Sequence, residues 1–144
     1  MSGFLLDTMV VSEGAKRRPN RGLAAWLSKT DEDSTYISAL TVGELQKGIS
    51  RLEQGTPRRT ELERWLTFDL IARFGRRVLA FDTDVARHWG TMVASVLDRG
   101  VVLSVVDSQI AATASLYGLK VVTRNERHFL PTGVSTFDPW SSGA

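Results

Sequence analysis

Three acidic residues stand where an α/β protein builds active sites. Asp7 directly follows the apolar run Phe4–Leu6, which has the length and composition of a short buried strand. Glu44 falls in the first turn of a helix predicted to begin at Thr41, and Asp107 stands at the predicted start of another helix. Ligands of an open parallel sheet bind beyond the carboxyl ends of its strands, where its helices also start. These three carboxylates are therefore candidates for one shared site.

If the three carboxylates converge, they require a divalent cation. Two carboxylates about 4 Å apart repel by roughly 4 kcal/mol at an effective dielectric constant near 20, so three will not all stay ionised without a positive charge. The chain has no Cys and only two His, which leaves hard oxygen ligands and favours Mg²⁺ or Mn²⁺ over Zn²⁺. Such an ion activates water and offsets the charge of a phosphodiester. The set would then support metal-dependent phosphodiester hydrolysis.

Two of the three acids also have purely structural interpretations. Thr41 and Glu44 have the spacing of a capping box, and Asp107 is a suitable N-cap for the helix that follows it. Asp7 is harder to explain in this way, because carboxylates beside a packed sheet are rarely left without a partner. Gly48, one turn after Glu44, leaves open space that suits either a ligand or a tight contact between helices.

Short apolar runs alternate with longer amphipathic stretches, and this alternation predicts the elements that position the acids. It favours an α/β fold: a single domain with a central, mainly parallel sheet flanked by helices, over residues 1–140, with a flexible tail at 141–144. The expected strands are 4–6, 36–37, 78–81, 119–123 and 134–137. Helices are expected before and after Pro19, from Thr41 to Gly55, after Pro57, from Asp82 to Gly100 and from Asp107 to Gly118. Thr123, Arg124 and Asn125 close or follow the fourth strand, at the same rim as Asp7.

Composition narrows the class of protein. The chain has 144 residues, of which 42 % are hydrophobic and 24 % charged, as expected for one globular domain. The lack of Cys excludes disulfide scaffolds and thiolate metal sites, and no apolar run approaches the roughly 18 residues of a membrane span. We therefore expect a soluble, cytoplasmic protein. The net charge of +2 indicates no particular partner, although the local basic cluster at 16–21 is compatible with phosphate contacts or with a solvated surface.

Four segments in order resemble the successive motifs of PIN-domain proteins, above all the VapC and FitB-like toxins of type II toxin–antitoxin systems. They are LLDT at 5–8, SALTVGEL at 38–45, VDSQIAATA at 106–114 and VTRN at 122–125. The closing FDPW at 137–140 is similar to the FitB-like end, so the likeness extends from about residue 4 to 140. It implies a PIN-like fold and an endoribonuclease that cleaves RNA with Mg²⁺ or Mn²⁺.

The resemblance also assigns roles to residues. Asp7, Glu44 and Asp107 match the acids that bind the metal, and Asn125 falls on the fourth acidic position of FitB-like members. The hydroxyls of nearby residues are expected either to hydrogen-bond the carboxylates or a metal-bound water, or to serve as ordinary caps. Arg124 is expected either to hold a phosphate or to pair with a surface acid such as Glu126. The supporting set is Thr8, Ser38, Thr123 and Arg124.

The sequence departs from the family pattern at two positions. Met9 stands where the family usually has Asn, and Asn125 is neutral. Other toxins of the family place an acid three residues further on, and that residue is His128 here. We therefore expect a largely one-metal site, with Glu126 as a possible substitute ligand.

Partners follow from the resemblance. It implies a cognate VapB- or FitA-like antitoxin that blocks the site, a homodimer, a toxin–antitoxin hetero-oligomer, and contact with operator DNA only through the antitoxin. Trp26, Trp65 and Trp89 have the spacing of core residues, although one or two of them suit a dimer or antitoxin interface.

Two other functions compete with this interpretation. One is a catalytically weak PIN-type module that binds RNA or protein, with Met9 and Asn125 as signs of decay. The other is a phosphoacceptor receiver domain, which fits poorly because Lys120 precedes its strand core instead of ending it.

Overall fold

Five parallel strands form the centre of the protein, in a computed structural model that describes residues 2–141. Within these residues the strand order is β3-β2-β1-β4-β5. The chain thus adds β2 and β3 on one side of β1 and then crosses over to add β4 and β5 on the other. The order reverses between β1 and β4, the place where parallel sheets open a crevice for ligands. The strands are β1 (Phe4–Leu6), β2 (Thr35–Ser38), β3 (Val78–Leu79), β4 (Lys120–Val122) and β5 (Thr136–Phe137).

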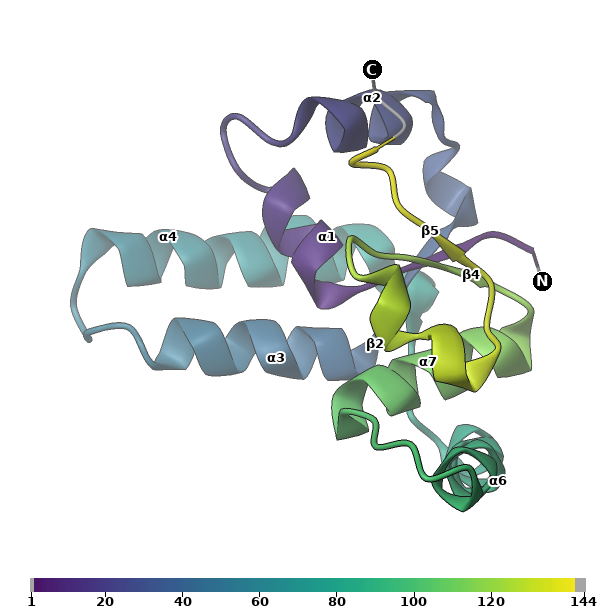
Figure 1. Cartoon of the computed structure of the whole chain (residues 1–144). Helices are drawn as coiled ribbons and strands as arrows, with labels where there is room; N and C mark the ends of the chain where they lie inside the picture. The colour runs from purple at the N-terminus through teal and green to yellow at the C-terminus, as the bar shows by residue number, and fades with distance from the viewer. Residues whose placement is uncertain (1, 142–144) are drawn as a thin grey trace.

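Helices cover both faces of the sheet (Figure 1). One face carries α1 (Thr8–Gly14), α2 (Arg21–Lys29), α3 (Ala39–Ser50) and α4 (Pro57–Arg64), which continues through a π-helical segment (Trp65–Ile71) into α5 (Ala72–Phe74). The other face carries α7 (Val105–Tyr117), and α6 (Thr83–Asp98) packs against α7. Short 3-10 turns lie at Glu32–Ser34, Gly75–Arg77, Glu126–His128 and Leu130–Thr132. Among the described helices, none is long and apolar enough to cross a membrane.

Alternation along the strands produces two hydrophobic cores. Leu6, Ile37 and Val122 point to the face of α1–α4 and join one cluster of buried residues. Leu5 and Val121 point the other way and pack against Ala-rich α7. Because both faces of the sheet are covered, its strands carry apolar residues on both sides, as in other parallel sheets. The α/β fold predicted from the sequence is therefore confirmed. Of the predicted tail at 141–144, residues 142–144 lie outside the described residues.

Two helices begin earlier than the sequence predicted, and in both the cap is a serine. Ser38 caps α3, since its Oγ accepts a hydrogen bond from Leu40 N (3.0 Å). The capping box predicted for Thr41 and Glu44 is therefore wrong. Ser104 caps α7 in the same way, and the N–H of Asp107 donates to its Oγ (3.4 Å), so Asp107 is not the N-cap. Both acids lie inside their helices and their carboxylates are not used for capping.

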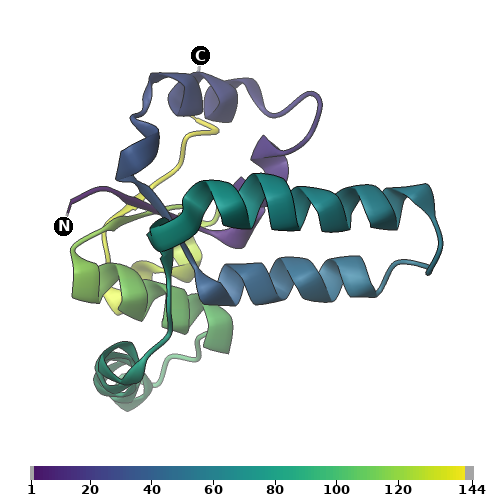
Figure 2. The same cartoon turned by 180° about the vertical axis from the view of Figure 1, so that it is seen from behind.

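Helices α3 and α4 form an antiparallel pair that extends away from the sheet (Figure 2). Glu44 lies near the base of this pair, in the half of α3 closer to the sheet. A Cβ built at Gly48 would meet no atom within 4 Å, so a tight helix contact does not explain this glycine.

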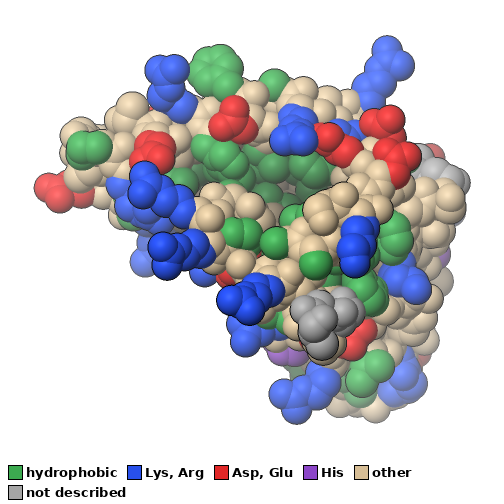
Figure 3. Space-filling model, turned by 90° about the horizontal axis from the view of Figure 1, so that it is seen from above, with side chains coloured by type: hydrophobic (Ala, Val, Ile, Leu, Met, Phe, Trp, Pro, Cys, Tyr) green, Lys and Arg blue, Asp and Glu red, His purple; other side chains and the backbone are tan. Residues whose placement is uncertain are grey.

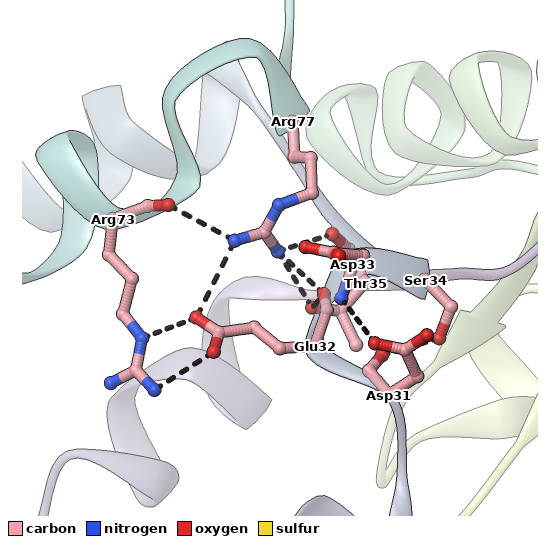
Figure 4. A network of polar contacts seen from close by, with 7 residues as sticks. All are labelled: Asp31, Glu32, Asp33, Ser34, Thr35, Arg73 and Arg77. Atoms are coloured by element: carbon pink, nitrogen blue, oxygen red, sulfur yellow. Dashed lines mark hydrogen bonds and ion pairs between the residues drawn. The ribbon is translucent and has the colours of Figure 1, made fainter.

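A partly buried arginine joins the segments that lead into β2 and β3 (Figure 4). The Nη1 of Arg77 donates to the carbonyl oxygens of Glu32 (2.7 Å) and Thr35 (2.8 Å), and its Nη2 donates to the carbonyl of Arg73 (3.1 Å). The guanidinium also lies over the ring of Phe74, 4.5 Å from its centroid. Arg73 pairs with the Glu32 carboxylate on the surface. Arg77 therefore satisfies backbone acceptors of two separate segments, whereas Arg73 makes an exposed ion pair.

Replacement of these two arginines should have unequal effects. Arg77→Ala removes the donors of three carbonyls and should lower the free energy of unfolding by about 2 kcal/mol. Arg73→Ala breaks only a solvated pair and should cost less than about 0.5 kcal/mol. Urea denaturation of both variants measures the difference. Equal losses would show that the backbone contacts of Arg77 do not stabilise the fold.

Candidate active site

Asp7 and Thr123 follow neighbouring strands at the rim where the strand order reverses. Leu6 pairs with Val122 in the parallel register of β1 and β4, and the N–H of Asp7 donates to the carbonyl of Val122 (3.1 Å). Thr123 is fully buried beside it. The structure therefore places Asp7 at the point of the sheet where the strand order reverses, the position at which parallel sheets bind their ligands.

The Asp7 carboxylate is buried, with 8 % of the residue exposed. Its Oδ1 accepts a hydrogen bond from Val10 N (3.0 Å) and caps α1. Burial raises the pKa of this carboxyl above its ordinary value; hydrogen bonds from Thr123 and Val10 oppose the rise, and the negative charge of Asp107 adds to it. Asp7 is thus a rigidly held carboxylate whose charge is poorly stabilised by the protein alone.

Glu44 is held from the neighbouring helix. The Thr8 hydroxyl donates to Glu44 Oε1 (2.5 Å) and also lies in hydrogen-bond contact with the Thr41 hydroxyl (3.1 Å). Thr8 is the first residue of α1 and directly follows Asp7, so the same turn that places Asp7 also orients Glu44. The structure brings Thr8 and Glu44 together at this rim.

Asp107 connects the other acids. Burial raises its pKa; the charge of His128 lowers it, and the negative charge of Glu44 raises it further. His128 Nδ1 lies 3.6 Å from Asp107 Oδ2. Asp107 thus experiences the charge of Glu44, and its own charge acts on Asp7. Asp107 therefore lies within electrostatic range of both Glu44 and Asp7, although the three acids come from separate elements.

The carboxylates do not form a closed cage as the side chains lie. Within residues 2–141, no group of three Asp, Glu or His side chains is arranged to hold a metal ion. The donor set nevertheless fits Mg²⁺ or Mn²⁺, because it consists of carboxylate oxygens. Asp7 and Asp107 are both desolvated, and each is repelled by another carboxylate of the set: Asp7 by Asp107, and Asp107 by Glu44. A divalent cation would offset both the desolvation of these carboxylates and the repulsion between them. Asp7, Glu44 and Asp107 are the residues that would hold it.

The two departures from the family pattern lie in contact. Asn125 Nδ2 approaches Met9 Sδ to 3.9 Å, and the Asn125 N–H donates to Thr123 Oγ1 (3.0 Å). Glu126, considered as a substitute ligand, instead accepts a hydrogen bond from Thr136 Oγ1 (2.8 Å). The side that follows β4 therefore presents a neutral amide next to a thioether.

The remaining predicted residues have mixed roles. Ser38 acts as the N-cap of α3. Arg124 lies over the ring of Trp140, 5.7 Å from its centroid, and its charge helps to lower the pKa of Glu13. The carboxylate of Glu126 accepts a hydrogen bond from the hydroxyl of Thr136.

The aromatic residues singled out in the sequence mostly serve packing. Trp26 packs against Phe4 and Phe137, with ring centroids 5.0 and 5.6 Å apart. Trp89 Nε1 donates to Ser108 Oγ (2.8 Å). Trp65 is partly buried against the core and also lines a groove.

Sequence reasoning missed this apolar groove. It runs between α1, α2 and the π-helical segment, and Figure 3 shows a hollow lined by hydrophobic side chains and bordered by charged ones. Apolar side chains that line it are Val10, Val11, Leu27, Trp65, Leu70 and Phe74, with Glu32, Asp69 and Arg73 among its charged residues. The spacing of Trp65 predicted a core residue, but nothing in the sequence indicated the π-helical segment that carries it or the groove beside it.

Comparison with known proteins identifies the family. A sequence model of the PIN domain matches residues 4–131. The chain belongs to the PIN domain family. This PIN domain is 35 % identical over 137 residues to "VapC ribonuclease Y4jK" of Sinorhizobium fredii, covering 95 % of the chain and 97 % of that protein. It is equally similar to "Toxin FitB" of Neisseria gonorrhoeae, over 95 % and 98 % of the two chains.

A solved structure shares the fold. The structure of FitAB bound to an IR36 DNA fragment contains a chain that superposes with a TM-score of 0.88 at 32 % identity, covering 95 % of both chains. Membership of the PIN family confirms the resemblance found in the sequence and leaves no support for a receiver domain.

The burial of Asp7 has a consequence for stability. The pKa of this carboxyl is higher in the folded chain than in the unfolded one, so the folded state binds protons more tightly and stability falls as pH rises above about 4. Asp7→Asn keeps a good N-cap but removes the charge. In the presence of a chelator it should raise the free energy of unfolding by about 1 kcal/mol at pH 7, and the gain should shrink toward pH 4.

A matched control is Asp82→Asn. Asp82 caps α6 by accepting from Val85 N (3.1 Å) but is exposed, so its replacement should change stability by less than about 0.5 kcal/mol. Urea titrations at pH 4 and pH 7 measure both variants. A loss of stability in Asp7→Asn at pH 7 would contradict the account of Asp7 as a destabilising buried charge.

Proposed function

We propose that this PIN domain is the toxin of a type II toxin–antitoxin system and acts in the cytoplasm as a Mg²⁺- or Mn²⁺-dependent endoribonuclease. The observation that carries the proposal is the position of Asp7 directly after β1, beside β4 where the strand order reverses, with Glu44 held by the hydroxyl of the adjacent Thr8 and Asp107 near enough for its charge to act on Asp7. The names of its relatives, a VapC ribonuclease and toxin FitB, support the same activity.

The residues of the site have three proposed roles: some hold the cation, others fix the carboxylates, and one contacts a phosphate. Asp7, Glu44 and Asp107 would hold the cation, which when bound supplies an activated water and offsets the charge of the phosphate. Thr8 fixes the Glu44 carboxylate, and the N–H of Val10 and the side chain of Thr123 fix Asp7. Because these partners are already in place, binding the cation requires little reorganisation of Asp7. Arg124, which follows Thr123 and lies over Trp140, is the proposed contact for a phosphate.

A basic face leads away from this site and suits an RNA backbone. Lys47 and Arg51 lie three and seven residues after Glu44, so they share its side of α3, and both are exposed. Gly48 lies between them, with open space where its side chain would be. RNA bound along α3 would place successive phosphates near these cations and one phosphodiester near the acids.

The proposed protein partner is a cognate antitoxin of the VapB or FitA type. The FitAB complex bound to a DNA fragment supports an antitoxin partner. Contact with operator DNA only through the antitoxin is a further part of the proposal. The apolar groove beside α1 is the proposed docking surface, because its lining is hydrophobic and its edge carries charges of both signs. A homodimer and a toxin–antitoxin hetero-oligomer complete the proposed assembly.

A catalytically weak RNA- or protein-binding module is the second candidate. The contact between Asn125 and Met9 favours it, because an uncharged pair stands where the family places groups that support the metal site. The two candidates differ in turnover: the toxin cleaves RNA with Mg²⁺ or Mn²⁺, and the module binds without cleavage.

Cleavage of purified RNA tests the proposal directly. Asp7→Asn and Asp107→Asn should each lower the rate with Mn²⁺ by about 100-fold or more and should relieve growth inhibition, because each removes a carboxylate that holds the cation. EDTA should abolish the activity of the unmodified protein. Asp82→Asn is the matched control and should remain active. Full toxicity of Asp107→Asn at equal abundance would contradict the metal role.

The neutral Asn125 leads to a prediction about stoichiometry. With no charge at the fourth acidic position, a second cation should bind weakly, so calorimetric titration should give close to one tight Mn²⁺ per chain. Two tight sites of equal affinity would contradict the one-metal site.

A further inference from the structure

We propose that His128 is a nitrogen ligand of the active-site cation and that it makes this site select Mn²⁺ over Mg²⁺. The inference rests on the proposed function, since it concerns the cation held by Asp7, Glu44 and Asp107. It puts a nitrogen ligand at a position where other toxins of the family place an acid.

The position of His128 is fixed by the turn that carries it. The 3-10 turn Glu126–His128 follows β4 at the candidate rim, and the N–H of His128 donates to the carbonyl of Asn125 (3.0 Å). The next residue, Phe129, is almost completely buried in the core beneath α7. His128 therefore projects from an anchored backbone, while 59 % of its side chain is exposed.

The imidazole faces an acid of the site. Nδ1 of His128 lies 3.6 Å from Oδ2 of Asp107, which is longer than an ordinary hydrogen bond. Two ligand atoms that each lie about 2.1 Å from one ion are separated by about 3.0 Å at a right angle and about 4.2 Å when opposite. The observed separation falls between these limits, so one ion can contact both atoms without movement of either backbone.

The three residues before His128 are less suited than His128 to serve as the additional ligand. The Asn125 amide contacts Met9, and Glu126 is bound by Thr136. Arg127 carries a positive charge and cannot be a ligand. Of the four residues 125–128, His128 is the one whose side chain contacts an acid of the site, since its Nδ1 faces Asp107.

A nitrogen ligand changes the preference of the site. Mg²⁺ strongly prefers oxygen ligands and an octahedral shell with several waters, whereas imidazole suits transition metals. An exposed ion pair between His128 and Asp107 is the competing explanation; such pairs contribute little to stability and predict no preference among cations.

The test combines calorimetry with electron spin-echo spectroscopy of bound Mn²⁺. In the unmodified protein, the Mn²⁺ signal should show coupling to the ¹⁴N of an imidazole. His128→Ala should lose this coupling and bind Mn²⁺ about tenfold more weakly, with less than about a twofold change for Mg²⁺. His128→Asp should lose the coupling and reduce the ratio of Mn²⁺ to Mg²⁺ affinity.

Two further variants separate the possible outcomes. His88→Ala changes the only other histidine, which bonds Ser115 Oγ (3.0 Å) away from the acids, and it should keep both the coupling and the affinity. Asp107→Asn should greatly weaken Mn²⁺ binding. If Asp107→Asn weakens binding but His128→Ala changes neither the ¹⁴N coupling nor the affinity ratio, the role of His128 is overturned and the proposed function stands. If the unmodified protein binds no Mn²⁺, or Asp107→Asn binds it equally well, both are overturned.

Discussion

Burial of a carboxylate at the carboxyl end of the central strand is the constraint on which the rest of the site depends. Asp7 loses solvation because β1 lies between β2 and β4 and because α1 begins immediately after it. Hydrogen bonds from Thr123, Val10 and Met9 compensate for only part of this loss, and Asp107 adds a second negative charge nearby. A protein that keeps such a group sacrifices stability at the position where a cation would restore it.

The serine caps are what free the other two acids for this arrangement. Ser38 and Ser104 accept hydrogen bonds from the first N–H groups of α3 and α7, so the carboxylates of Glu44 and Asp107 are not needed as N-caps. Thr8 then orients Glu44 across the gap between α1 and α3. The two caps therefore also determine where these acids lie, because a change of either cap would move the start of a helix that carries a carboxylate.

Much of the fold was predictable because its signals are local. The alternation of apolar runs located all five strands, and Asn20, Asp82 and Gly118 ended or began helices as expected. Convergence of the acids could be inferred only through the family resemblance, since nothing in their spacing fixes how strands cross over. The sequence pattern suggested capping roles for Glu44 and Asp107, but the nearby serines Ser38 and Ser104 are the N-caps. The groove and the orientation of His128 depend on tertiary packing, which no sequence period records.

The central claim is that Asp7, Glu44 and Asp107 share one divalent cation. The most direct measurement is a crystal structure of the protein grown with Mn²⁺, in which anomalous scattering locates the ion. The account predicts a strong peak at the rim between β1 and β4, within coordination distance of oxygens from all three carboxylates. A peak elsewhere, or one that contacts none of the three, would contradict it.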